Sequence, residues 1–288
     1  MNVSTLIGNR PVKKSLKEYA RGITGGLLFS FPLLYTMEMW WAGFSATPVQ
    51  LLALVVVTYL LLLGYNRYAG MRPGVSWRSV IIDSVEEMGI GLVISFAVLY
   101  TLNRIQPAEM AFSEVIGKVL LEAIGVSIGV SIGTAQLSTA DTEAEETGND
   151  DDLEAEKEPG NWGMVVLAFC GALLIGGNVA PTEEVIMLAV EASPVHILMM
   201  ALASIGLSVI VVYFSDFKGT ATQHGKDFLF WLILDTCVSY LVALVVSALI
   251  LWFFGRLSGV SFWTGFSEVI VLGVLSSLGA SAGRLLIR

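Results

Sequence analysis

Long apolar stretches separated by short polar segments run through most of the chain. A helix that crosses a bilayer needs about 20 predominantly apolar residues. Eight such stretches can be delimited, at residues 22–44, 48–66, 79–103, 111–133, 163–188, 194–214, 228–254 and 264–287. Lipid offers no hydrogen-bond partner to open backbone groups, so each stretch is expected to be helical. The pattern predicts an all-α, polytopic membrane protein with eight transmembrane helices.

Short motifs occur twice along the chain, in the same order. The matched pairs are Thr36 and Thr182, Ala46–Leu51 and Ala192–Ile197, Asp83 and Asp235, Arg104 and Arg256, Phe112–Ile116 and Phe266–Ile270, and Gly125–Gly129 and Gly279–Gly283. Each half then holds four predicted spans. Because four is an even number, both halves begin on the same side of the membrane, so we expect two parallel four-helix repeats.

Composition supports a membrane location and divides the chain. Only 14% of the residues are charged, against about 25% in soluble proteins. The net charge of −9 arises in one segment, because residues 138–158 hold ten acids and one base. We therefore predict a basic cytoplasmic N-terminus at 1–21, a first repeat at 22–133, an acidic disordered cytoplasmic linker at 134–162 and a second repeat at 163–288.

The basic residues predict the orientation. With a cytoplasmic N-terminus, thirteen Lys and Arg residues fall in inside segments and only Arg104 and Arg256 in outside loops. Cytoplasmic segments of membrane proteins carry such an excess. We expect a multi-pass protein of the cell inner membrane with both termini in the cytoplasm. The scattered bases argue against nucleic-acid binding, which leaves the lipid bilayer as the expected partner. A homo-oligomer or a small membrane partner stays open.

Acidic residues inside the predicted spans are the candidate functional groups. The ten are Glu38, Asp83, Glu86, Glu87, Glu114, Glu122, Glu183, Glu184, Asp235 and Glu268. An ionised group at the centre of a span costs about 2.5–3.5 kcal/mol on insertion scales. We therefore expect these side chains to face the bundle interior, where they pair, titrate or bind cations.

Counting from the ends of the spans places the acids at two levels. Glu38, Glu184, Glu114 and Glu268 lie at an outer level, where together they are a possible metal site. Asp83, Glu86, Glu87 and Asp235 lie toward the cytoplasmic side, and Glu122 lies between the two levels. Carboxylates without nearby histidine or thiol suit Ca²⁺, Mg²⁺ or Mn²⁺ as transported substrates, or protons. No other cofactor is expected.

Three bases are candidate counter-ions for these acids. Arg104 could pair with Glu114, and Arg256 with Glu268. Lys118 lies four residues from both Glu114 and Glu122, on one face of a helix, and could pair with either. Pairing of this kind is also what a purely structural role would require.

The two glycine motifs read G-x-S-x-G, which is also a hydrolase pattern. A hydrolase needs that motif at a turn between a strand and a helix, whereas here it falls within predicted spans. Close helix packing through Gly125, Gly129, Gly279 and Gly283 is the favoured interpretation. By symmetry these glycines could bring the fourth and eighth spans together. We assign no catalytic residue and expect no enzyme.

The whole-chain pattern resembles an uncharacterised family of bacterial integral membrane proteins. The resemblance rests on the two similar halves, the repeated Phe-Ser-Glu-Val-Ile motif and the acidic connector, and it implies no particular activity. The residues themselves favour a cation or proton transporter or channel that uses intramembrane carboxylates. The alternative is a membrane assembly or interaction protein with internally paired charges. A membrane-embedded hydrolase ranks third.

Overall fold

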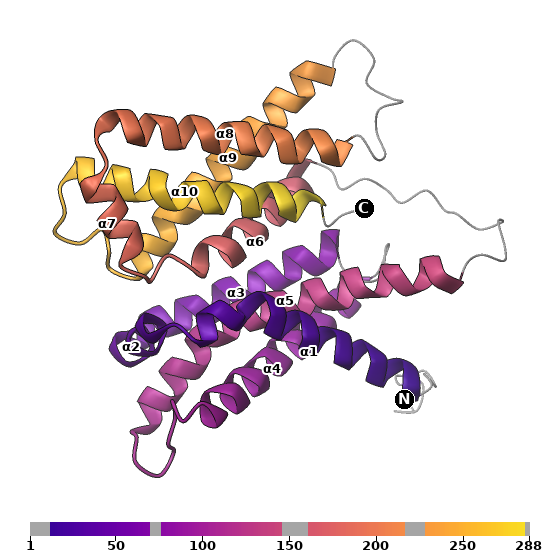
Figure 1. Ribbon diagram of the computed structural model, residues 1–288. Helices are drawn as coiled ribbons and strands as arrows, with labels where there is room; N and C mark the ends of the chain where they lie inside the picture. Colours follow the sequence, from indigo (N-terminus) through magenta and orange to yellow (C-terminus); the bar gives the residue numbers. More distant parts are fainter. Residues whose placement is uncertain (1–11, 70–75, 146–160, 217–227, 286–288) are drawn as a thin grey trace.

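The computed structural model describes residues 12–69, 76–145, 161–216 and 228–285, and this part of the chain is helical without any strand (Figure 1). The helices are α1 (Val12–Leu34), α2 (Met37–Ser45), α3 (Pro48–Tyr68), α4 (Trp77–Thr101), α5 (Phe112–Glu145), α6 (Asn161–Gly177), α7 (Glu184–Glu191), α8 (Pro194–Asp216), α9 (Phe228–Phe253) and α10 (Phe262–Leu285).

Local sequence signals explain where several of these helices begin. Thr47 caps α3: its hydroxyl accepts from the Gln50 N–H (3.4 Å), and the Gln50 side chain accepts from the Thr47 N–H (2.9 Å). Pro48 occupies the first turn, where its missing N–H costs no helical hydrogen bond. Ser76 caps α4 through the Ser79 N–H (3.4 Å). Caps of this kind satisfy N–H groups that the first helical turn leaves open.

Two predicted spans are each divided into a long and a short helix. The stretch 22–44 contains the end of α1, a break at Tyr35 and Thr36, and most of α2. The stretch 163–188 contains α6, a turn over residues 178–183 and the start of α7. Pro32 lies in the last turn of α1 and has no N–H to donate to the regular backbone hydrogen bonds of the helix. The prediction of one continuous helix in each stretch was wrong.

The structure is that of a polytopic helical membrane protein, although eight spans are not shown. In the described part, five helices are long and apolar enough to cross a membrane: α3, α5, α8, α9 and α10. The apolar helix Trp162–Gly177 is shorter. The helices α1 and α4 are longer than 18 residues but are not among the five, and both carry charged side chains.

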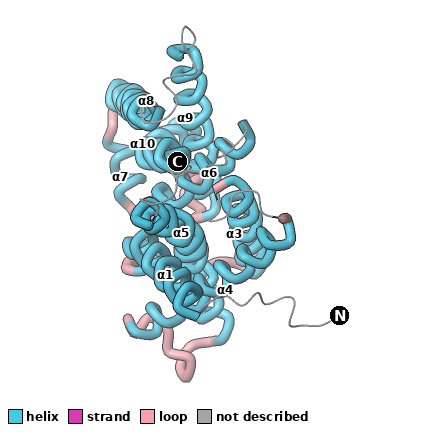
Figure 2. The backbone as a smooth tube through the Cα atoms, turned by 90° about the vertical axis from the view of Figure 1, so that its right-hand side faces the viewer, coloured by secondary structure: helices cyan, strands magenta, loops and turns pink. Residues whose placement is uncertain are grey.

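The helices form two groups, each arranged around one buried helix (Figure 1). In the first group α5 contacts α1, α2, α3 and α4, and in the second α10 contacts α6, α7, α8 and α9. In α5 78% of the apolar window is buried, against 17% in α8. Figure 2 shows the two groups side by side from another direction. The central helices therefore carry the side chains best shielded from lipid.

The two groups meet mainly through α6, which contacts α1, α3 and α5. The core of this contact contains Leu62 and Tyr65 of α3, Ile128 of α5, and Leu167 and Leu174 of α6. The close approach of Gly64 to the Val166 side chain brings α3 and α6 together. The described groups therefore share a continuous apolar interface.

Glycines set the tightest contacts inside each group. A Cβ on Gly25 of α1 would lie 2.5 Å from the Gly129 carbonyl oxygen of α5. A Cβ on Gly171 of α6 would collide with the Gly279 carbonyl of α10, and one on Gly283 with the Leu167 carbonyl. The glycine ridges of α5 and α10 thus face the first helix of their own group. Their predicted meeting with each other was wrong, because α1 and α6 already occupy them.

The described helices also extend beyond the boundaries expected from composition. The helix α5 continues past residue 133 to Glu145, and α6 begins at Asn161, so both ends of the predicted linker 134–162 are helical. Alanine and glutamate, which are common between 140 and 146, are strong helix formers. The helix α1 likewise begins at Val12, within the predicted N-terminal segment 1–21. Residues 146–160 lie outside the described part.

Candidate functional site

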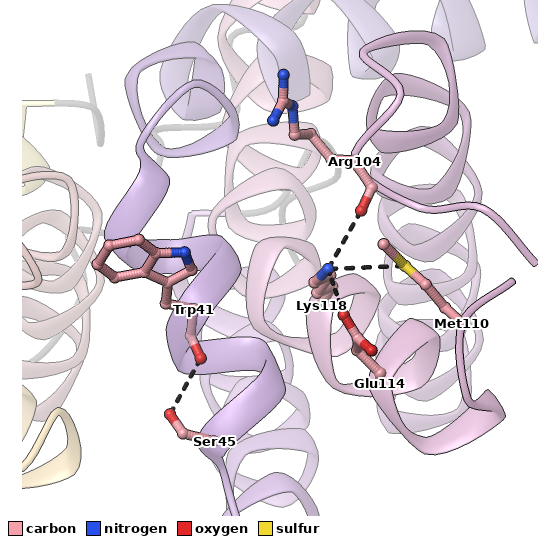
Figure 3. A network of polar contacts seen from close by, with 6 residues as sticks. All are labelled: Trp41, Ser45, Arg104, Met110, Glu114 and Lys118. Carbon is pink, nitrogen blue, oxygen red and sulfur yellow. Dashed lines mark hydrogen bonds and ion pairs between the residues drawn. The ribbon is translucent and has the colours of Figure 1, made fainter.

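The beginning of α5 holds a buried lysine with three partners (Figure 3). The Lys118 ammonium lies 2.7 Å from a Glu114 carboxylate oxygen, 3.2 Å from the Arg104 carbonyl oxygen and 3.7 Å from the Met110 sulfur. Side chains lean toward the N-terminus of a helix, which brings Lys118 to Glu114 rather than to Glu122. Lys118 is therefore the counter-ion of Glu114.

Arg104 has a different role from the pairing with Glu114 that the sequence suggested. Its guanidinium lies over the Trp40 ring, 4.4 Å from the ring centroid, in a cation–π contact. Trp40 in turn donates its indole N–H to the Leu34 carbonyl at the end of α1 (3.2 Å). The pairing of Arg104 with Glu114 was wrong, because Lys118 reaches the carboxylate from the same helix.

The base expected to pair with Glu268 in the second group has another partner. Arg256 donates to the Pro181 carbonyl oxygen in the turn between α6 and α7. Glu268 of α10 is fully buried, and neither of its carboxylate oxygens has a hydrogen-bond partner among the described residues. Arg256 acts on Glu268 through its electrostatic field, but no direct ion pair between them is formed in the described part.

Glu87 belongs to a buried network that joins three helices. The Asn66 amide of α3 donates to Glu87 of α4 (2.6 Å) and to the Ser84 hydroxyl (3.1 Å). From α5, the Ser131 hydroxyl donates to Asn66 (2.8 Å) and Thr134 contacts Glu87 (3.4 Å). A carboxylate with several donors can be accommodated in a buried site. The amide and hydroxyl partners were missed from the sequence, where only charges were followed.

The other acids predicted at the inner level are not all placed around Glu87. Glu86 is exposed, although it adjoins Glu87 in the sequence, because neighbouring helical residues point about 100° apart. Asp83 is half-buried and lies in the field of Glu87. Asp235, in α9, is in the second group. The expectation that the acids of the predicted spans face the bundle interior was wrong for Glu86.

Glu122 is the most isolated charge-bearing side chain of the first group. It is 1% exposed, and both of its carboxylate oxygens lack hydrogen-bond partners among the described residues. On the N-terminal side, the Lys118 backbone meets Gly43 of α2. On the C-terminal side, Gly125 meets the Ser30 hydroxyl and the Leu33 side chain of α1. Glu122 therefore lies on α5 at the level of the break between α1 and α2.

Glu38 and Glu184 lie at the beginnings of the two short helices. Glu38 is half-buried in the first turn of α2, and Glu184 is exposed in the first turn of α7. The Thr182 hydroxyl lies within reach of both Glu184 and the Val179 carbonyl (2.8 Å) and has one proton to give. Its hydrogen bond, followed by that of the Glu184 backbone, lowers the pKa of Glu184 below the usual value.

The four outer acids do not form the metal site that the sequence suggested. Within the described residues, no three His, Cys, Asp or Glu side chains lie close enough together to hold a metal ion. Glu38 and Glu114 belong to the first group, and Glu184 and Glu268 to the second. A shared site for Glu38, Glu184, Glu114 and Glu268 is therefore not present in this arrangement.

The fold and its interior acids define the class of the protein: a polytopic helical membrane protein with carboxylates inside its helix groups. The chain belongs to the family described as "Putative integral membrane protein (DUF2391)", whose profile matches residues 18–287. This confirms the resemblance seen in the sequence. No curated protein and no solved structure matches the chain.

Proposed function

We propose that this chain moves protons or small cations across the membrane by means of its intramembrane carboxylates. The observation that carries the proposal is the burial of Glu122 and Glu268 without a hydrogen-bond partner in the described structure. An unpaired ionised carboxylate in such a place costs several kcal/mol. A proton or a bound cation removes that cost, and a group that alternates between these states can carry charge.

Protons and monovalent cations are favoured over divalent ions as the transported species. Glu122 and Glu268 each supply one negative charge, and the described residues contain no three-ligand acidic cluster. Divalent cations such as Ca²⁺ usually take six to eight oxygen ligands with several carboxylates among them. Ca²⁺, Mg²⁺ and Mn²⁺ are therefore secondary candidates in the experiment below.

We further infer that the two helix groups are parallel copies of one unit. The chain would then cross the inner membrane eight times, with both termini in the cytoplasm. The matching breaks at Thr36 and Thr182 support this inference, as do the glycine contacts of Gly25 and Gly171 in their respective groups. Interrupted helices at corresponding positions are frequent at transporter binding sites. The excess of basic residues in the inside segments supports the orientation.

A flux measurement tests the proposal. The protein is reconstituted into liposomes that contain a pH-sensitive dye, and an ion gradient is imposed. We expect proton or monovalent cation flux that is lost in Glu122→Gln or Glu268→Gln. Glu109→Gln, in the exposed segment between α4 and α5, is the matched control and should keep the flux. Absence of flux for protons, Na⁺, K⁺, Ca²⁺ and Mn²⁺ would overturn the proposal.

The second candidate is an assembly protein whose charges are paired for structural reasons. The ion pair of Lys118 with Glu114 and the network around Glu87 favour it, since both satisfy buried charges internally. For such an assembly protein we expect no ion flux through the wild type. We also expect Glu122→Gln to raise the stability of the protein. The same liposomes, together with thermal unfolding of the variants, separate the two candidates.

A further inference from the structure

Glu87 is a buried carboxyl group whose protonation state can be inferred from its hydrogen-bond partners. It is 8% exposed and lies where α3, α4 and α5 meet. An ionised carboxylate only accepts hydrogen bonds, at about four lone-pair positions, whereas the protonated acid also donates one. The number of donors that the neighbouring side chains can give therefore indicates which state the site fits.

Most protons of the network around Glu87 are directed to other acceptors. One N–H of the Asn66 amide points to Oε2 of Glu87 (2.6 Å), and the same nitrogen donates to the Ser84 hydroxyl (3.1 Å). The Ser84 hydroxyl gives its own proton to the Val80 carbonyl oxygen (2.8 Å). The Ser131 hydroxyl also lies within reach of Glu87, but its single proton goes to the Asn66 carbonyl oxygen (2.8 Å). These groups leave Glu87 with one close donor.

The Thr134 hydroxyl is the remaining neighbour, and it lies closer to backbone carbonyls than to the carboxyl group. Its oxygen is 2.9 Å from the Ser131 carbonyl oxygen, 3.1 Å from the Val130 carbonyl oxygen and 3.4 Å from Oε1 of Glu87. Its one proton is best used at the shorter distances. The Thr134 oxygen can then accept a hydrogen bond, so a proton on Oε1 has an acceptor on that side.

The charged groups of α4 and α3 give Glu87 no counter-ion. Asp83, one turn earlier on α4, acts on Glu87 with a charge of the same sign. Arg67 is the one charged residue of α3, and its guanidinium lies over the Trp77 ring, 5.5 Å from the ring centroid. Both helices therefore disfavour a negative charge at Glu87 or leave it without compensation.

The bases of α1 and α5 do not compensate Glu87 either. Arg21 of α1 passes close to α5, because its carbonyl oxygen would lie 2.8 Å from a Cβ on Gly133. The charge of Arg21 is not among those that act on Glu87. Lys118 of α5 is paired with Glu114. A buried ionised group without a partner charge needs several donors to offset its loss of hydration, and Glu87 has one close donor.

We propose that Glu87 binds one proton in the folded protein and is a neutral carboxylic acid between α3, α4 and α5. In this state Oε2 accepts from Asn66, and the proton on Oε1 points to the Thr134 oxygen. A metal cation fits less well, because the amide N–H that points at the carboxyl group would repel it. The second group carries Ser239 at the matched position, so the proton site belongs to the first group alone.

The proton site is separate from the carboxylates that carry the proposed function, which are Glu122 and Glu268, and it does not require ion flux. Loss of the proton leaves a buried charge with one close donor, which destabilises the contact of the three helices. The packing of the first group is therefore expected to depend on pH through Glu87.

Infrared spectroscopy of the reconstituted protein tests the site directly. A protonated carboxylic acid has a carbonyl stretching band that a carboxylate lacks. We expect this band in the wild type at neutral pH, with part of it lost in Glu87→Gln. Glu86→Gln, at the exposed neighbouring position, is the matched control and should keep the whole band. In Thr134→Val the band should shift, because the acid proton loses its acceptor.

Thermal unfolding at different pH values gives a second readout. In the unfolded chain Glu87 titrates near the usual value for glutamate, about 4.3. A fold that prefers the neutral acid loses stability as the pH rises above that value, whereas glutamine has no proton to lose. The Tm of Glu87→Gln should therefore increase relative to that of the wild type between about pH 5 and pH 8. Glu86→Gln should show no such trend.

An acid band that is unchanged in Glu87→Gln would overturn the site. A Tm of Glu87→Gln that falls relative to the wild type as the pH rises would do so as well, because the amide reproduces the donor and acceptor of the neutral acid. An unshifted band in Thr134→Val would overturn the part assigned to that hydroxyl. Loss of the band in Glu87→Gln without any flux in liposomes would keep the proton site and remove the proposed transport.

Discussion

The side chain of Asn178 accepts a hydrogen bond from the backbone N–H of Leu33 (3.1 Å), which joins the two helix groups at their breaks. Asn178 directly follows α6, and Leu33 lies in the last turn of α1. The Asn178 amide also donates to the Phe29 carbonyl oxygen (3.3 Å). Phe29 and Leu33 are the two residues that a regular helix would bond to each other. Beside Pro32, the Asn178 side chain therefore bonds to both backbone groups of this helical hydrogen-bond pair.

Replacing Asn178 should loosen the contact between the groups. In Asn178→Ala the buried Leu33 N–H loses its acceptor, and we expect a loss of about 1–3 kcal/mol of stability. Asn178→Asp keeps an acceptor for Leu33 but no donor for Phe29, so its effect should be smaller if only the acceptor matters. Thermal unfolding in detergent measures both. An unchanged Tm in Asn178→Ala would mean that α1 closes this hydrogen bond by itself.

The glycine contacts make a prediction about packing. A Cβ at Gly25 or Gly171 would meet backbone of α5 or α10, which cannot move aside as a flexible side chain can. We expect Gly25→Ala and Gly171→Ala each to cost about 1–3 kcal/mol. Gly89 of α4 has no atom within 4 Å of its Cβ position, so Gly89→Ala is the control. It should be neutral or stabilising by up to about 1 kcal/mol.

Denaturant unfolding of the three glycine variants gives the comparison. Similar losses at Gly25 and Gly171 would support the idea that the two groups are built alike. If Gly89→Ala destabilised the protein as much as the other two, the close approach would not be the cause.

The apolar pattern predicted the helices well where a span is uninterrupted, as in α3 and α8. It did not predict the breaks, because averaging over about 20 residues conceals them. The second break had local signals in Gly176-Gly177-Asn178 and Pro181, which are turn formers. The first had only Pro32, which is tolerated inside many membrane helices. Hydropathy alone therefore gives the number of apolar stretches better than the number of helices.

The candidate site could be predicted only in its charges. Glu122 and Glu268 stand out in apolar stretches, since a carboxylate there is costly. Ser84 and Ser131 of the network around Glu87 do not stand out, because a serine hydroxyl is small and can bond the carbonyl four residues earlier, as Ser84 does with Val80. Which base reaches Glu114 also depended on geometry: Lys118 leans toward it along α5, while Arg104 stacks on Trp40.

The lowered pKa of Glu184 predicts a small dependence of protein stability on pH. The hydrogen bond from Thr182 lowers the pKa of this exposed carboxyl below its usual 4.5. A lowered folded-state pKa means that the ionised form stabilises the fold, so the contribution is present at neutral pH and is lost as the pH falls below 4.5 through the folded pKa. In Thr182→Val we expect the Glu184 pKa to rise toward its usual value.

Nuclear magnetic resonance of labelled glutamate, with Glu184→Gln to assign the signal, measures this pKa in both proteins. Because Glu184 is exposed, added salt should weaken any accompanying change in acid stability. A pKa that is the same in the wild type and in Thr182→Val would show that the Thr182 proton goes to the Val179 carbonyl instead.

The Lys118–Glu114 pair predicts strong coupling between the two side chains. Lys118 is 7% exposed and lies 2.7 Å from Glu114, which precedes it by four residues, the favourable order on a helix. Lys118→Met leaves the carboxylate without its counter-ion, and Glu114→Gln leaves a buried ammonium. Each single change should destabilise the protein, and the double variant should recover part of the loss. A double-mutant cycle by thermal unfolding should give a coupling of about 1–3 kcal/mol. Additive losses would show instead that Lys118 is held by the Arg104 carbonyl and Met110, and that Glu114 contributes little to its burial.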